Sequence, residues 1–514
     1  MSLNKQTILI LDYGSQYTQL IARRVREQKV YSEILPHSAS YKEITQTNPI
    51  AIILSGGPDS VSDDGAPSLN PAIMKIGVPI LGICYGFGLL MKYDNGIVKS
   101  NSQREYGFTK INIEKDSILL KGIKQGTQVW MSHGDSIKKL PNNWSIIARS
   151  NNGVLAVAEK QGGKIFGTQF HPEVIHTVDG EKILSNFLFD VVKCSQSWTS
   201  ASFIQSTIHG IKEKIGNEKV ICGVSGGVDS TVLAKLIHEA IGDSLRCVFI
   251  DHGLLRKNEI EYIQNRLVDV LGIEIEIHDF SNTFINNLKT ITDPEKKRLI
   301  IGEQFIRAFE KATKSKTHFK FLGQGTLYPD IIESGGVRGT ADVIKSHHNV
   351  GGLPKDINFE LLEPLRELFK DEVRDVGKAL GLPTDVLGRH PFPGPGLGVR
   401  IIGEVTKSRL KMLRESDHIF IQALRDHNIY DDIWQAFAVL IPVKTVGVMG
   451  DERTYANLIA LRAVTSIDGM TADWYRISDE VLAEVSNNIV NSVSGVNRVV
   501  YDISSKPPST IEWE

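Results

Sequence analysis

The sequence contains few cysteines, almost no net charge and no long uninterrupted apolar run. Its four cysteines, among 514 residues, show no paired C-x-x-C spacing, so neither a zinc site nor a disulfide framework is predicted. The 58 basic and 60 acidic residues nearly cancel, which leaves no general attraction to nucleic acid or to an anionic membrane surface. The longest apolar stretch, residues 78–91, is broken by glycines and too short to span a membrane. We therefore expect a cytoplasmic protein that binds small molecules, with neither nucleic acid nor a membrane as partner.

Short apolar runs alternate with helix-like segments along most of the chain. Such runs occupy residues 7–11, 50–54, 78–83 and 164–170, and then residues 219–222, 246–250, 273–277 and 319–322. Buried runs of this kind, separated by helices, are typical of parallel sheets that are covered on both faces. Open parallel sheets bind their ligands at the carboxyl ends of the strands, so polar residues at those ends are the candidate ligand-binding residues.

Two irregular segments divide the chain into three parts. Residues 193–202 are polar and serine-rich, and residues 390–398 contain three prolines and three glycines. The length also favours roughly three domains. The predicted fold class is α/β, with two doubly wound, mostly parallel-sheet domains followed by a smaller α+β C-terminal domain. Their predicted bounds are 1–195, 196–389 and 390–514.

The segment Gly82-Ile83-Cys84-Tyr85-Gly86 lies between an apolar strand and a helix-like segment. A tight strand-to-helix turn with small neighbours exposes its central side chain near helix N-terminal amides, which favour a thiolate and can stabilise an oxyanion. The segment therefore predicts a cysteine nucleophile at Cys84. A buried core cysteine explains this segment alone about equally well.

A second strand end supplies a candidate base for Cys84. His171 follows the run 164–170, and Glu173 lies two residues further on, where its carboxylate can orient the imidazole ring. A lone histidine is more often structural, but this pairing favours a catalytic triad. The turn 55–58 ends another strand, so Gly57 and Tyr85 are the candidate oxyanion and glutamine-binding residues, although the turn alone requires no such role.

These pieces, with Arg104-Glu105-Tyr106-Gly107 and Ser132-His133-Gly134-Asp135, closely resemble the class I glutamine amidotransferase domain over residues 1–195. The resemblance implies that Cys84 attacks the glutamine carboxamide, that His171 protonates the departing ammonia, and that Glu173 holds the histidine. The family usually has a glutamine that helps to hold the substrate where this chain has Gly88.

A glycine-rich loop follows the first strand of the second predicted domain and opens a helix. Such a loop can hold phosphate on its backbone N–H groups, aided by the helix dipole. It lacks the lysine of a Walker A loop and resembles the loop of enzymes that split ATP into AMP and pyrophosphate. The predicted ATP-binding residues are Ser225, Gly226, Gly227, Val228, Asp229, Ser230 and Thr231. The same resemblance implies Mg²⁺ at Asp229.

Two further strand ends add polar candidates to this domain. Arg256 follows the strand 246–250 and would emerge at the same edge as the glycine-rich loop. The glycine-rich stretch 331–356 is predicted to be a lid over the active site. Its segment 345–349, with two adjacent histidines, offers no third metal ligand, so a polar lid or a plain surface role is preferred.

Both constellations, in this order, resemble the glutamine-hydrolysing GMP synthase family over nearly the whole chain. Further motifs carry the resemblance: KSHHNVGGLP, RHPFPGPGLG, GVMGDERTY and the final KPPSTIEWE. It implies that ATP adenylylates xanthosine 5'-monophosphate (XMP) and that ammonia displaces AMP to give GMP. It also implies a homodimer and an acceptor site that includes Lys506, Ile511, Glu512 and, less firmly, Arg256. The sequence alone indicates only a frayed tail for the last residues.

Two other functions remain open at this point. One is an ATP-pyrophosphate-forming amidoligase with a different acceptor, and the other is a nucleotide-sensing protein whose glutaminase half is inactive, for which Gly88 is the motive. If the enzyme assignment is right, nucleotide binding should stimulate the glutaminase through domain movement about residues 193–202, because ammonia released early is protonated and wasted.

Overall fold

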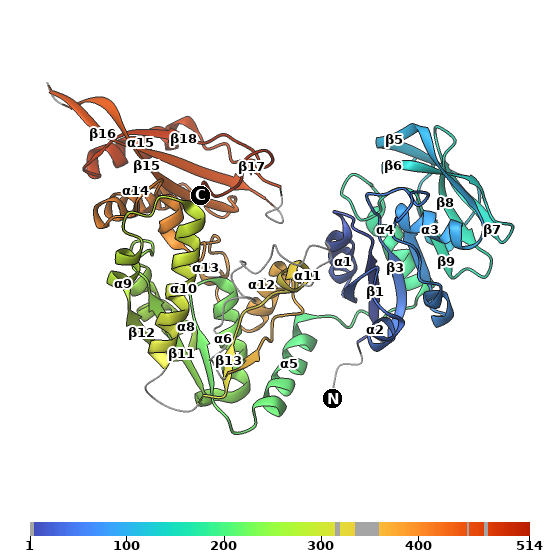
Figure 1. The fold of residues 1–514 in the computed structure, drawn as a ribbon, viewed down its shortest axis with the longest axis horizontal. Helices are drawn as coiled ribbons and strands as arrows, with labels where there is room; N and C mark the ends of the chain where they lie inside the picture. Colours follow the sequence, from blue (N-terminus) through green and yellow to red (C-terminus); the bar gives the residue numbers. More distant parts are fainter. Residues whose placement is uncertain (1–4, 314–318, 335–358, 450–451, 467–470) are drawn as a thin grey trace. The chain divides into compact units, whose positions relative to one another are not determined.

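The computed structural model of the protein describes residues 5–313, 319–334, 359–449, 452–466 and 471–514. These residues form two units, one that ends at Ser206 and one that begins at Thr207 (Figure 1). Part of the predicted linker 193–202 packs on the first unit, because the Trp198 N–H donates to Lys29 O at 2.9 Å and its ring lies 4.8 Å from that of Tyr31. The predicted segment 345–349 lies outside the described residues.

The first unit is built around a nine-stranded sheet whose order is β2-β1-β3-β4-β9-β8-β7-β5-β6. Five neighbouring strands are parallel: β2 (Tyr31–Pro36), β1 (Thr7–Asp12), β3 (Pro49–Leu54), β4 (Ile80–Ile83) and β9 (Ile165–Thr168). Four antiparallel strands extend them: β8 (Leu155–Lys160), β7 (Trp144–Ser150), β5 (Ile97–Ile113) and β6 (Gln128–Lys139). The apolar runs that predicted β1 and β3 are almost completely buried, as expected for central parallel strands.

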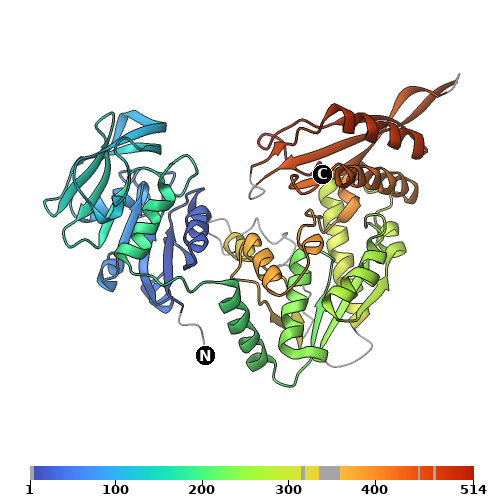
Figure 2. The same cartoon turned by 180° about the vertical axis from the view of Figure 1, so that it is seen from behind.

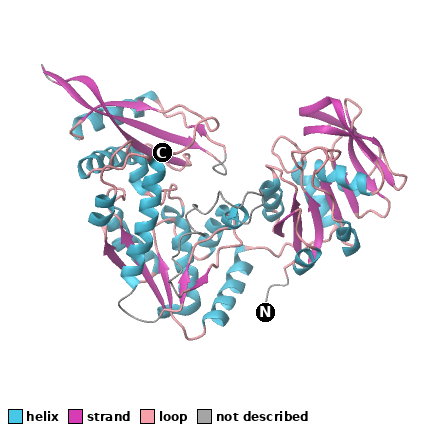
Figure 3. Cartoon of the chain, in the orientation of Figure 1, coloured by secondary structure: helices cyan, strands magenta, loops and turns pink. Residues whose placement is uncertain are grey.

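Helices cover this sheet, and two of them connect parallel strands (Figure 3). They are α1 (Thr18–Glu27), α2 (Tyr41–Gln46), α3 (Tyr85–Tyr93) and α4 (Gly180–Ser185). The parallel part confirms the doubly wound prediction. The antiparallel extension was not predicted, because its strands carry alternating polar residues and lack the continuous apolar runs of the parallel ones.

The second unit begins with a fully parallel five-stranded sheet of order β12-β11-β10-β13-β14. Its strands are β10 (Val220–Gly223), β11 (Leu245–Asp251), β12 (Ile275–Asp279), β13 (Phe321–Gly323) and β14 (Glu360–Leu362). The helices of this part are α5 (Ser200–Ile215, which starts in the first unit), α6 (Val228–Ile241), α7 (Glu259–Glu261), α8 (Val268–Leu271), α9 (Ser281–Asn287), α10 (Pro294–Thr313), α11 (Tyr328–Ser334), α12 (Lys370–Ala379) and α13 (Thr384–Leu387). The strand order reverses at β10, so the loop after β10 lies at the switch point where such sheets bind ligands.

The C-terminal part of this unit is α+β, as predicted. A long antiparallel hairpin, β15 (Gln435–Met449) and β16 (Glu452–Thr465), is joined by β17 (Asp473–Trp474) and by β18 (Val496–Tyr501), which runs parallel to β16. Helices α14 (Lys407–Asp426) and α15 (Asp479–Ser492) pack with this sheet. One continuous apolar core includes Ile221 and Val248 of the parallel sheet and Leu440 and Ile459 of the hairpin, so both parts form one body. Among the described helices, none is long and apolar enough to cross a membrane.

Candidate functional site

The first candidate site lies at the carboxyl ends of three neighbouring strands, β3, β4 and β9. Cys84 is the residue between β4 and α3, and its backbone has φ of 53°, a left-handed value that is uncommon for a residue other than glycine. The Cys84 N–H donates to Thr168 O at 2.7 Å, which fixes the turn to the end of β9. Cys84 therefore occupies a strained strand-to-helix turn, as the nucleophile prediction requires.

The glycines on either side of Cys84 allow this turn to form. A Cβ atom on Gly86 would lie 2.4 Å from Leu54 O of β3, and one on Gly82 would lie 2.7 Å from Gly86 O. Both distances are shorter than any tolerable contact, and a main-chain atom is the obstacle in each case. The G-x-C-x-G spacing is thus a packing requirement at the point where α3 crosses the sheet.

The candidate base is buried and paired with its carboxylate. His171 Nδ1 lies 2.7 Å from Glu173 Oε1, and both side chains are shielded from solvent. Burial disfavours the charged ring, but the Glu173 carboxylate and the hydrogen bond with Cys84 outweigh it and raise the pKa of His171 well above its usual value. The three side chains are therefore brought together in the order nucleophile, base and orienting carboxylate.

The predicted oxyanion residues also meet beside Cys84. Tyr85 is the first residue of α3, so its N–H belongs to the first helical turn, where N–H groups have no partner within the helix. A Cβ atom on Gly57 would lie 3.1 Å from Tyr85 Cγ, so this glycine lies directly against the tyrosine. The Cys84 thiol donates to Ser132 O at 3.6 Å. The roles of Gly57 and Tyr85 stay predictions.

Gly88 lies one turn into α3, and its N–H donates to Cys84 O at 3.1 Å. A Cβ atom there would lie 3.0 Å from Val61 Cγ1, so Val61 occupies the space into which a longer side chain would begin to extend. The Val61 N–H in turn donates to Asp135 Oδ2 at 2.9 Å. Val61, the residue that lies against Gly88, is thus itself held in place by Asp135.

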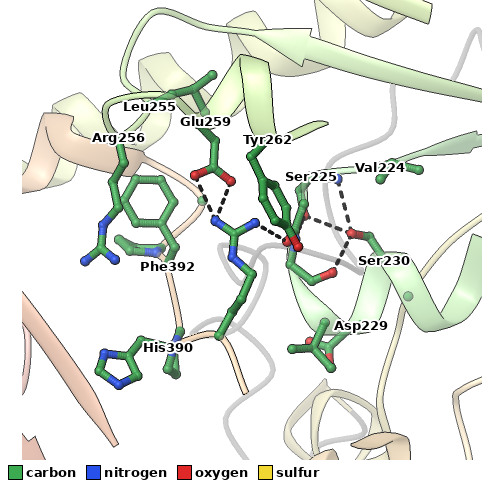
Figure 4. A pocket seen from close by; sticks show the side chains of 18 of the residues that line it. Val224, Ser225, Asp229, Ser230, Leu255, Arg256, Glu259, Tyr262, His390 and Phe392 are labelled. Carbon is green, nitrogen blue, oxygen red and sulfur yellow. Dashed lines mark hydrogen bonds and ion pairs between the residues drawn. The ribbon is translucent and has the colours of Figure 1, made fainter. Parts of the chain in front are cut away.

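The second candidate site lies after β10, in the second unit. The loop 224–227 is closed by a hydroxyl of the first turn of α6: the Ser225 N–H donates to Ser230 Oγ at 3.1 Å (Figure 4). Ser230 Oγ in turn donates to Gly227 O at 3.1 Å. Gly226 has φ of 77°, where a larger residue would be strained. The loop leads into α6, which places backbone N–H groups at a helix N-terminus, the geometry that binds phosphate.

Arg389 fixes this loop from outside. Its Nη2 donates to both carboxylate oxygens of Glu259, at 2.6 and 2.8 Å, while its Nη1 donates to Gly226 O at 3.1 Å. The guanidinium also lies 4.1 Å from the Tyr262 ring centre, a cation–π contact. The sequence predicted no role for Arg389 or Glu259, although Arg389 is the first residue of the motif RHPFPGPGLG.

A large cavity of about 2210 Å³ adjoins the loop, a volume that can take more than one nucleotide. It is lined by the loop residues and by residues of α10, α12 and α14. Arg256 lines this cavity, where its Nε lies 3.1 Å from Asp417 Oδ2 and its guanidinium 5.3 Å from the Phe392 ring centre (Figure 4).

The other three predicted acceptor residues are fixed near each other but do not line this cavity. The Glu512 carboxylate receives two hydrogen bonds from Arg400, at 2.8 and 3.1 Å. Ile511 is buried in an apolar cluster with Phe437, and Lys506 pairs with Ala472 through its main chain. The interpretation of the last residues as a frayed tail is therefore wrong, because specific contacts hold them. The acceptor role of all four residues stays a prediction.

Asp229 is the candidate Mg²⁺ ligand. Its Oδ2 lies 3.4 Å from Lys370 Nζ, whereas its Oδ1 is buried and has no hydrogen-bond partner among the described residues. Within the described ranges, no group of three or more His, Cys, Asp or Glu side chains could hold a metal ion. A single carboxylate fits Mg²⁺ that is shared with substrate phosphates, which is the usual arrangement for nucleotide enzymes.

The chain matches known families and proteins along almost its whole length. Residues 9–191 match the class-I glutamine amidotransferase family, residues 201–295 the PP-loop domain, and residues 422–513 the GMP synthase C terminal domain. A GMP synthase [glutamine-hydrolyzing] of Chlorobium chlorochromatii is 54% identical over 515 residues, which cover 99% of this chain and 100% of the relative. Proteins of the same name are 53% identical in Aquifex aeolicus and 51% identical in Brachyspira hyodysenteriae, each over 100% of both chains. The chain therefore belongs to the glutamine-hydrolysing GMP synthase family.

Proposed function

We propose that the protein releases ammonia from glutamine in its first unit and uses it in its second unit to convert XMP into GMP, with ATP split into AMP and pyrophosphate. The carrying observation is that one chain holds a Cys84–His171–Glu173 arrangement and a phosphate-binding loop at 225–231, each at the carboxyl edge of its own parallel sheet. The relatives that match the full chain carry the name of this activity.

In the first unit, Cys84 Sγ attacks the glutamine carboxamide carbon while His171 accepts the thiol proton. His171 then gives this proton to the departing nitrogen, which leaves as ammonia, and water hydrolyses the glutamyl thioester. The pKa of His171, raised by Glu173 and by the hydrogen bond with Cys84 against the effect of burial, supports a ring that can hold this proton between the two steps. Main-chain N–H groups of Gly57 and Tyr85 would stabilise the oxyanion.

In the second unit, residues Ser225 to Thr231 bind the ATP phosphates, with the N–H groups of the loop and of the first turn of α6 directed at them. Mg²⁺ would be held by Asp229 together with phosphate oxygens, and would neutralise charge on the leaving pyrophosphate. Asp229 Oδ1, which has no hydrogen-bond partner in the described part of the chain, supports this placement. The XMP oxygen attacks the α-phosphate, pyrophosphate leaves, and ammonia then displaces AMP from the purine carbon.

We further propose three domains with bounds 1–195, 196–389 and 390–514, and an acceptor site that includes Arg256, Lys506, Ile511 and Glu512. Support comes from the separate family matches and from the fixed position of the chain end. The four cysteines are unpaired thiols, which supports a cytoplasmic location.

A homodimer through the C-terminal hairpin is also proposed. Val446, Val448 and Tyr455 of β15 and β16 are 52%, 73% and 61% exposed, an unusual set of apolar side chains for a solvent-facing hairpin. Sedimentation of the purified protein tests this: a dimer is expected, and a monomer at micromolar concentration would contradict it.

The test of the activity is conversion of XMP to GMP with ATP and magnesium, with either glutamine or ammonium supplied. We expect Cys84→Ala to lose glutamine-dependent synthesis and to keep ammonium-dependent synthesis, while the control Cys194→Ala keeps both. Absence of GMP from ammonium with the unaltered protein would refute the acceptor, and would favour an amidoligase with another acceptor or a nucleotide sensor.

A further inference from the structure

Three basic side chains, each completely buried, hold the last thirteen residues of the chain. They are Arg462 on β16, Arg400 in the 3-10 segment Gly396–Arg400, and Lys297 on α10, and each has an exposed fraction of 0%. Buried cations are rare because removing a charge from water is strongly unfavourable unless the charge is paired. In each of these cases the partner is the C-terminal tail.

Arg462 holds the beginning of the tail. Its guanidinium donates to the main-chain oxygens of Asp502, Ser504 and Thr510, and its Nη1 lies 3.4 Å from Asp502 Oδ1. The tail is thus bound on both sides of the segment that contains Lys506.

Arg400 holds the tail two residues before its end, through two hydrogen bonds to Glu512. Its guanidinium also lies 4.1 Å from the Phe437 ring centre and 5.2 Å from that of Phe392, whose ring is shared with Arg256. This contact links Glu512 to a residue that lines the cavity.

Lys297 holds the chain end. Its Nζ donates to Ile401 O at 2.7 Å and to the carboxylate of Glu514. The Gly403 N–H donates to the other Glu514 carboxylate oxygen at 3.3 Å, and Arg298 donates to the Glu514 main-chain oxygen. Figures 1 and 2 show the C-terminus beside α10 from both sides.

Helix α10 contacts both the tail and the cavity. Lys297 points to the tail, while the nearby α10 residues Arg298, Ile301 and Gly302 line the cavity. A movement of the tail end would therefore shift the α10 residues that line the cavity. Burial lowers the pKa of Lys297, and the Glu514 carboxylate opposes this, so the pair depends on both partners.

We propose that Lys297 is a positioning residue for the acceptor nucleotide: by fixing Glu514 it holds the end of the tail against Arg298, which lines the cavity. This inference rests on the proposed function, because it takes XMP as the acceptor. It concerns the affinity for XMP and predicts no change in the affinity for ATP or glutamine.

The test uses the full-length protein with ammonium as nitrogen donor. Lys297→Met and Glu514→Gln should each raise KM for XMP about tenfold, which corresponds to about 1.4 kcal/mol of binding free energy. KM for ATP, and kcat at saturating XMP, should stay within about twofold of their values in the unaltered protein. The control Lys235→Met removes a half-exposed i,i+4 pair with Glu239 on α6 and should change none of these values.

Because Lys297→Met can impair folding, deletion of Glu514 alone serves as the second variant, and it should raise KM for XMP in the same way. A second readout is digestion with carboxypeptidase, where XMP should protect the end of the unaltered chain but not that of Glu514→Gln. An unchanged KM for XMP in Glu514→Gln and in the deletion would overturn the inference. Failure of the unaltered protein to make GMP would instead refute the proposed function.

Discussion

Replacement of Arg389 by methionine tests whether the phosphate-binding loop depends on a cation outside it. Arg389 makes a two-point ion pair with Glu259 and donates to Gly226 O. Its side chain therefore joins the Glu259 carboxylate to the loop. Methionine fills most of the same volume and removes the charge. The variant therefore leaves a carboxylate with little access to solvent and a loop carbonyl without this donor.

The size of the expected stability loss follows from the burial of the Arg389–Glu259 pair. The two side chains are 21% and 10% exposed, so the pair is largely but not completely shielded. Breaking a buried pair by removal of one partner costs about 3–5 kcal/mol, and the partial exposure favours the lower end, about 3 kcal/mol. For a unit of this size that loss lowers the melting midpoint by roughly 5–10 °C.

The assay is GMP synthesis from ammonium, with KM measured for ATP and for XMP, beside thermal unfolding. We expect KM for ATP to rise at least about tenfold, because the proposed phosphate-binding loop loses its external support. Basal glutamine hydrolysis in the first unit should not change. The control Arg246→Met removes an exposed pair with Glu276 at 3.0 Å and should alter neither KM nor the melting midpoint noticeably.

A double variant separates the two effects. Adding Glu259→Gln to Arg389→Met removes the unpaired charge, so it should recover much of the lost stability, but it cannot restore the bond to Gly226 O, and KM for ATP should stay high. If Arg389→Met binds ATP normally, or if the double variant restores KM for ATP, the reasoning about loop support is wrong.

Three predictions concern the first unit. Because Glu173 raises the pKa of His171 above its unfolded value, Glu173→Gln should lower the melting midpoint most below about pH 6.5, and the deficit should disappear as the pH rises through the native pKa; a deficit that grows with pH would contradict this. Gly86→Ala should abolish glutamine-dependent but not ammonium-dependent synthesis, since its Cβ would meet a β3 carbonyl at 2.4 Å, and full glutamine activity would refute the turn argument. Gly88→Gln should reduce glutamine hydrolysis when introduced alone and should regain it when combined with Val61→Ala, which removes the 3.0 Å contact; equal rates in the single and double variants would show that Val61 is not the obstacle.

Much of the fold was predictable because buried parallel strands leave a clear pattern. The continuous apolar runs before Cys84 and before the loop at 225–231 correspond to β4 and β10, and glycines mark the turns that follow them. The antiparallel strands β5 to β8 were missed, because alternating or mixed polarity is shared by edge strands, loops and surface helices.

The candidate nucleophile, base and phosphate loop could also be proposed from the sequence. Each depends on a local requirement: a tight turn at Cys84, a strand end at His171, a left-handed glycine at Gly226. Local requirements of this kind restrict which residue types can occupy a position, so they remain visible in a sequence without coordinates.

The supporting contacts were decided only by the tertiary structure. Arg389 and Glu259 are 130 residues apart, and Lys297 and Glu514 are 217 residues apart, so no local pattern links either pair. A lone charged residue in a sequence most often indicates a solvated surface position. Whether it is buried, and which distant partner makes burial tolerable, depends on how segments far apart in the chain pack together, because the free energy of a charge is set by its surroundings in space and not by its neighbours in sequence.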